Sequence, residues 1–155
     1  MIPKLYNATI LLAFIFSGCS EYWWTRGQVK SSHAIVRAAQ ARLSAQAASA
    51  PGELSSCAFA LQHSVLDAMN SNSMRSSKAA EHERLAAIEH DTLCVSSLLS
   101  PGAQPAFAEL RAQLLEFSAL AAQGKEINSA GFDVWTARML LLLAAELESR
   151  QNSAG

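Results

Sequence analysis

The densest cluster of titratable side chains lies at residues 81–84 (Glu-His-Glu-Arg) and 89–91 (Glu-His-Asp). Carboxylates and imidazoles bind metals and transfer protons, so this segment is the first candidate for chemistry. His82 and Glu89, however, are two helical turns apart, or about 10.5 Å along the axis, and the i+4 partner of His82 is Ala86. These side chains on a single helix therefore cannot bind the same metal ion. We expect a solvated polar face, with a metal site between helices or between molecules as the alternative.

The rest of the sequence carries no catalytic signature. It lacks the His-Glu-x-x-His, Gly-x-Ser-x-Gly and Cys-x-x-Cys-His motifs and a phosphate-binding glycine loop. His33 and His63 stand alone on their predicted helices, and surface or boundary positions are expected for them. Met69 and Met139 are expected in the core rather than as haem ligands. We therefore predict a protein that is not an enzyme and has no catalytic residue, no metal ligand and no cofactor.

Composition favours one helical domain. The chain has 155 residues, of which 50% are hydrophobic and 16% charged, and its formal net charge is -1. This length suits a single domain with a real core. The charge is too low for the basic surface of a nucleic-acid-binding protein. Few glycines, few prolines and a scarcity of β-branched runs favour helices over sheets.

The first twenty residues have the pattern of an export signal. Lys4 precedes a short apolar run at residues 5–16, and small residues follow. Residues 16–19 (Phe-Ser-Gly-Cys) resemble the bacterial lipobox, in which a hydrophobic residue, two small residues and a cysteine mark cleavage and lipidation. The resemblance implies a signal peptide at 1–18 and an acylated Cys19, carrying palmitate-like chains, as the first mature residue. Ser20, in place of an aspartate, implies the outer membrane, with the protein facing the periplasm.

Two alternatives to the lipoprotein signal remain open. The first is an uncleaved membrane helix, but the apolar run is shorter than the roughly 20 residues that a bilayer requires. The second is an ordinary soluble helix.

Several acyl chains on Cys19 would hold the protein firmly in the membrane, because each buried methylene contributes about 0.8 kcal/mol.

An aromatic segment follows the lipobox. Residues 19–27 form a predicted lipidated tether that contains Tyr22, Trp23, Trp24 and Arg26. Tyrosine and tryptophan favour the membrane–water interface, and together with arginine they also dominate protein-docking sites. Interface anchoring, packing onto the helical core and docking to a partner are the three interpretations.

The remaining sequence predicts a helical bundle domain at residues 28–150 and a frayed C-terminus at 151–155. Apolar residues recur at helical spacing between breaks at Pro51-Gly52, at the polar connection 70–77, at Pro101-Gly102 and at Gly124. Pro51 is expected in the first turn of the second helix, and the third helix is expected to reach about residue 100 with an apolar surface widened by Leu93. The fold class is all-α, a compact four- or five-helix up-down bundle behind a lipoprotein signal peptide.

Cys57 and Cys94 remain once Cys19 is acylated. An exported domain with two thiols favours one disulfide. The midpoint of the two positions falls in the polar connection, so an antiparallel pair of helices would bring them level. Two separately buried thiols are the alternative.

These features predict a non-enzymatic outer-membrane lipoprotein of the cell envelope. It would attach to the membrane through its lipid and act as a scaffold or escort for a protein partner. The plan is similar to that of the secretin pilotins, which are small outer-membrane lipoproteins that can be all-helical with one disulfide. A groove between helices that takes a partner helix would be the mechanism. A periplasmic helical bundle that binds a metal or a small ligand is the alternative.

Overall fold

The structure is a computed structural model that describes residues 32–72 and 77–154, and the regular structure within these ranges is entirely α-helical. Five helices follow one another there: residues 32–49, α2 (Glu53–Asn72), α3 (Lys78–Ser96), α4 (Gln104–Ala122) and α5 (Ser129–Ala154). The predicted all-α bundle is therefore confirmed, with five helices. The predicted signal peptide (1–18) and tether (19–27) lie outside the described residues.

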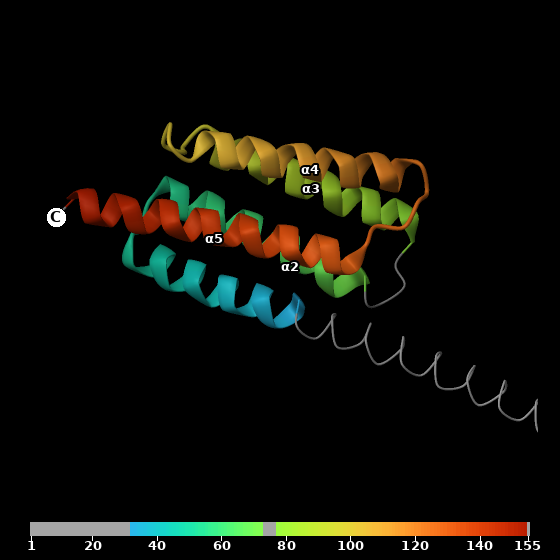
Figure 1. Ribbon diagram of the computed structural model, residues 1–155, viewed down its shortest axis with the longest axis horizontal. Coiled ribbons are helices and arrows are strands. Elements are labelled where there is room, and N and C mark those ends of the chain that lie inside the picture. Colours follow the sequence, from blue (N-terminus) through green and yellow to red (C-terminus); the bar gives the residue numbers. More distant parts are fainter. Residues whose placement is uncertain (1–31, 73–76, 155) are drawn as a thin grey trace, which may run out of the picture.

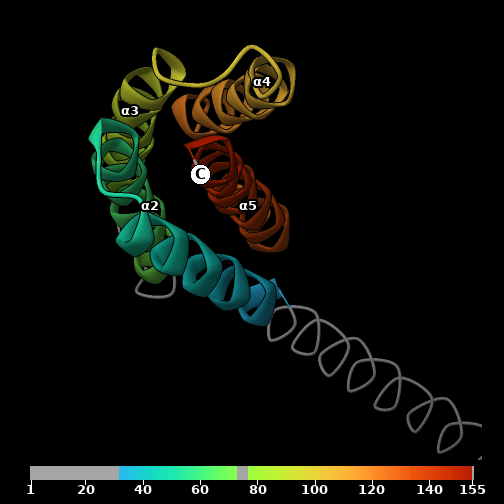
Figure 2. The same ribbon diagram turned by 90° about the vertical axis from the view of Figure 1, so that its left-hand side faces the viewer.

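Successive helices run antiparallel (Figures 1 and 2). Helix 32–49 packs against both α2 and α5, and α5 also contacts α4. Contacts at both ends of helix 32–49 show that it runs parallel to α5, because Ser32 meets Asp133 and Ser49 meets Gln151. Position 32 and the C-terminus consequently lie at opposite ends of the bundle (Figure 1).

The core is continuous across all five helices, and α5 contributes most to it. The rings of Phe117, Phe132 and Trp135 form one aromatic cluster, with centroids 5.3–6.1 Å apart. The Trp135 indole N–H donates to the Leu110 carbonyl at 2.8 Å. Met139 is fully buried as predicted. Leu93, which was expected to widen the apolar surface of the third helix, lies on a side of α3 that its neighbours do not cover and is 56% exposed.

Local capping signals fix several helix ends. Ser77 caps α3 by accepting a hydrogen bond from the Ala80 N–H at 3.3 Å. Gly124 has φ +67° and closes α4 with the bond pattern of a Schellman motif, in which the Lys125 N–H reaches the Leu120 carbonyl. Asn128 caps α5 by accepting from the Gly131 N–H. These glycine, serine and asparagine signals were all visible in the sequence.

Three expected boundaries differ from the structure. Pro51 precedes α2, whose first residue is Glu53. The third helix ends at Ser96 rather than near residue 100, because the Gln104 amide donates to the carbonyls of Ser96 and Leu99 and holds a turn there. Helix α5 continues to Ala154, so residues 151–154 are helical.

Candidate functional site

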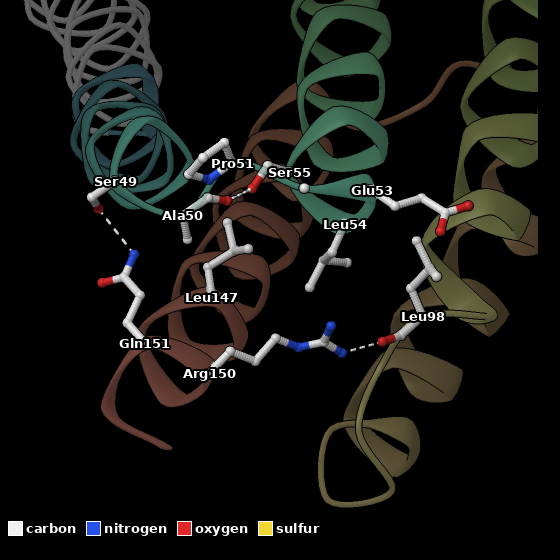
Figure 3. Close-up of a pocket in the computed structure, with 11 residues that line it drawn as sticks. Ser49, Ala50, Pro51, Glu53, Leu54, Ser55, Leu98, Leu147, Arg150 and Gln151 are labelled. Carbon is white, nitrogen blue, oxygen red and sulfur yellow. Dashed lines mark hydrogen bonds between the residues drawn. The ribbon is translucent and has the colours of Figure 1, made fainter. Parts of the chain in front are cut away.

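A well-defined opening lies at the end of the bundle farthest from Ser32. It is a cavity of about 440 Å³ between the turn 49–53, the segment after α3 and the last turns of α5 (Figure 3). Figure 2 looks onto this end of the molecule, where α5 finishes. Elements that are far apart in the sequence therefore form one site.

Leucines from three elements line the cavity. Leu54 comes from the first turn of α2, Leu98 from the segment after α3, and Leu147 from α5 (Figure 3). Leu54 and Leu147 belong to the buried core, and Leu98 is partly buried against it. The inner wall of the cavity is therefore an apolar surface that can accept an apolar group.

A buried carboxylate supports the wall beside these leucines. Glu146 is 6% exposed and accepts hydrogen bonds from the Ser100 N–H at 3.0 Å and the Ser100 hydroxyl at 2.7 Å. The Arg150 Nε–H donates to the same carboxylate at 3.0 Å, and a second guanidinium N–H donates to the Leu98 carbonyl. This network ties α5 to the connection between α3 and α4.

Opposing effects act on the pKa of Glu146. Burial raises it, whereas the hydrogen bonds from Ser100 and Arg150 and the positive charge of Arg150 lower it, and the pKa lies below its ordinary value. Glu146 is therefore ionised at neutral pH and forms a charge-assisted pair with Arg150.

Polar side chains close the opposite edge of the cavity. The Gln151 amide donates to the Gln46 carbonyl at 3.1 Å and to the Ser49 hydroxyl at 2.9 Å. The Ser55 hydroxyl donates to the Ala50 carbonyl. These hydrogen bonds join the end of helix 32–49 to the end of α5 and the following turn to α2, so they hold this edge of the opening.

The disulfide braces the same end of the bundle. Cys57 of α2 and Cys94 of α3 are bonded, with their Cα atoms 5.8 Å apart. Cys57 is one turn beyond Leu54, and Cys94 lies in the last turn of α3. The predicted pairing is confirmed, and it fixes two of the elements that border the cavity.

The titratable cluster of α3 divides into two groups. His82, Glu83 and His90 are exposed, as expected of a solvated face, whereas other members contact neighbouring helices. Asp91 accepts from the Ser64 hydroxyl at 2.6 Å, and Glu89 accepts from the Ser118 hydroxyl. Arg84 pairs with Asp67 at 3.3 Å. Across residues 32–72 and 77–154, the acidic, histidine and cysteine side chains gather nowhere in groups of three or more that could hold a metal ion.

The two isolated histidines differ in their surroundings. His63 is exposed. The ring of His33 lies 3.4 Å from the carboxylate of Asp133, which is buried and also accepts from the Ser32 hydroxyl at 2.6 Å. This contact joins the start of helix 32–49 to α5 at the end opposite the cavity.

The other residues predicted to carry function precede Ser32. Cys19, Tyr22, Trp23, Trp24 and Arg26 lie outside the described residues. None of the helices described is both long enough and apolar enough to cross a bilayer.

Sequence reasoning missed the cavity. A signal was present at its supporting carboxylate, because Glu146 falls on the apolar face of α5 between Leu143 and Leu147 and has Arg150 one turn later. An acid on a buried face with an arginine at i+4 indicates a paired charge. The leucines themselves could not be distinguished from ordinary core residues.

Comparisons with protein-family models, with curated proteins and with solved structures found no match for this chain.

Proposed function

We propose that this chain is a lipid-anchored adaptor of the bacterial cell envelope. In this proposal Cys19 carries the lipid and holds the protein on the outer membrane. The helical bundle then presents a protein-binding site to the periplasm and escorts or scaffolds a larger assembly. The proposal assigns no catalytic role to any residue.

One observation carries the proposal. Helix 32–49 runs from one end of the bundle toward the other (Figure 1), and the cavity lies beside its last residue, Ser49. An anchor that precedes Ser32 would therefore leave the cavity end available to a partner. The lipobox resemblance at residues 16–19 supplies the anchor.

The disulfide and the polar contacts support this assignment. An oxidised Cys57–Cys94 pair suits an exported domain. The buried acids Asp133 and Glu146 are each engaged by neighbouring side chains, which is an arrangement that stabilises a fold. The secretin pilotins offer a similar plan, and a comparable escort role is part of the proposal.

The test is crosslinking in cells that produce the full-length protein, followed by mass spectrometry, with Cys19→Ala as the matched variant. We expect palmitate incorporation and a reproducible envelope partner for the native chain, and loss of both for Cys19→Ala. Failure to incorporate palmitate, or crosslinks to cytoplasmic proteins only, would overturn the proposal.

The cavity also supports a second candidate, a periplasmic small-ligand carrier. Its volume of about 440 Å³ is within the range of small-molecule pockets. Mass spectrometry under native conditions, metal analysis and an absorption spectrum of the purified protein test this candidate. A stoichiometric ligand or metal would favour it over the adaptor.

A further inference from the structure

We propose that the cavity holds one apolar side chain of the partner, on a segment that carries a lysine or arginine close to that side chain. This inference rests on the proposed adaptor function and specifies its binding site.

The lining selects an apolar group of limited size. Leu54, Leu98 and Leu147 provide the inner wall, and Pro51 adds an apolar edge (Figure 3). A cavity of about 440 Å³ is large enough for a leucine or an aromatic side chain, and anchor residues of this kind dominate protein interfaces. The hydrogen bonds at both edges keep the cavity formed before a partner arrives, which lowers the cost of binding.

The charges at the mouth favour a cation beside that anchor. Arg150 is balanced by Glu146, to which it is bonded, whereas Glu53 is an exposed carboxylate at the mouth (Figure 3). Three helices end at this side of the bundle and two begin there, so the partial charges of the helix ends sum to a small negative value. Complementarity therefore requires a positive charge on the partner.

The position of the cavity agrees with a partner held away from the membrane. The turn 49–53 and the end of α5 border the cavity, whereas Ser32 contacts Asp133 near the start of α5 and so lies at the far end. A segment docked on the cavity would meet the bundle end-on. It would not compete with the anchor that precedes Ser32.

Glycines at this end of the bundle provide a matched pair of crosslinking sites. A side chain added at Gly52, which lines the cavity, or at Gly102, which does not, would meet no atom within 4 Å. The photoreactive p-benzoylphenylalanine is introduced at each position in turn in the full-length protein in cells, and the crosslinked segment is mapped by mass spectrometry. We expect an adduct from position 52 and none from position 102, with an apolar residue near a lysine or arginine in the mapped segment.

Charge reversal provides the second readout. We expect Glu53→Lys to lower the yield of the position-52 adduct by roughly fivefold. Glu83→Lys makes the same charge change on an exposed residue of α3 and should leave the yield unchanged. Equal effects of the two reversals, an acidic or wholly polar segment, or an adduct with a lipid or small molecule would each overturn the inference.

The outcomes separate the inference from the adaptor function. No adduct at position 52, in cells where the Cys19-dependent partner is still crosslinked elsewhere, refutes the docking site and leaves the adaptor in place. Loss of palmitate and of every envelope partner refutes the adaptor itself.

Discussion

Glu146 shows how one buried charge stabilises the cavity end of the bundle. Its carboxylate accepts from Ser100 and Arg150. Glu146→Gln keeps the shape but loses the charge-assisted bonds, and we expect a loss of about 1–3 kcal/mol in the free energy of unfolding near neutral pH. Urea unfolding followed by circular dichroism measures this loss. Glu148→Gln is the matched control, because Glu148 pairs with Arg42 at the surface and its loss should cost little.

The pH dependence of this loss follows from the lowered pKa of Glu146. A carboxyl group whose folded pKa lies below its unfolded value stabilises the fold above the unfolded pKa, and this contribution disappears as the pH falls through the folded pKa. The difference between the native chain and Glu146→Gln should therefore shrink on acidification below about pH 4. A difference that stays constant from neutral pH to about pH 2 would contradict the assignment.

Thr136 contrasts with Glu146, because its buried hydroxyl makes no hydrogen bond within the described part of the chain that would offset the cost of burial. Thr136 is fully buried, and its hydroxyl has no hydrogen-bond partner among the described residues. Thr136→Val replaces that hydroxyl with a methyl group, and we expect a gain of about 1 kcal/mol in the free energy of unfolding. Thr92 is equally buried, but its hydroxyl donates to the Glu89 carbonyl at 2.7 Å. Thr92→Val should therefore bring no gain, and equal gains at the two sites would refute this explanation.

At the scale of elements, two glycines test the importance of helix termination. Gly124 ends α4 with φ +67°, and an added Cβ would lie 3.0 Å from the Lys78 Nζ atom. We expect Gly124→Ala to lower the free energy of unfolding by about 1 kcal/mol or more. Gly102→Ala has open space and no positive φ, so it should be neutral or slightly stabilising. Thermal unfolding of both variants compares them directly.

The disulfide contributes to stability through the α2–α3 pair. Cys57 and Cys94 are separated by 37 positions in the sequence, and closing a loop of this size contributes about 2–4 kcal/mol. We expect the double variant Cys57→Ala, Cys94→Ala to fold with that much less stability. Adding a reductant should lower the unfolding midpoint of the native chain and leave that of the double variant unchanged. A native chain that is insensitive to the reductant would contradict this prediction.

The ends of several helices could be predicted from the sequence because the residues that cap them act locally. Ser77, Gly124 and Asn128 each act on backbone groups within a few residues, so the ends that they cap were predictable. The end of α3 was not, because the Gln104 amide reaches back to Ser96 from the next element. The helical end of α5 also depends on a distant contact, between Gln151 and Gln46.

The cavity belongs to the scale of the whole molecule and was therefore invisible to pattern analysis. Leu54, Leu98 and Leu147 follow ordinary helical spacing, and nothing in that spacing shows that three elements leave a gap between them. The disulfide was predictable because the antiparallel pairing of two neighbouring helices needs only their connection. The cavity, in contrast, forms only where α5 packs beside the turn 49–53, which is distant from it in the sequence.

A single core predicts one cooperative unfolding transition. Buried side chains run without a break from Val36 in helix 32–49 to Leu147 in α5, so no group of the five described helices has a separate core. Trp135 reports the tertiary structure of the centre once Trp23 and Trp24 are replaced by phenylalanine. In urea, its fluorescence and the helical circular dichroism signal should lose their native values at the same midpoint. Helical signal that persists after Trp135 is exposed would show that the disulfide-linked α2–α3 pair survives alone and that the chain is not one folding unit.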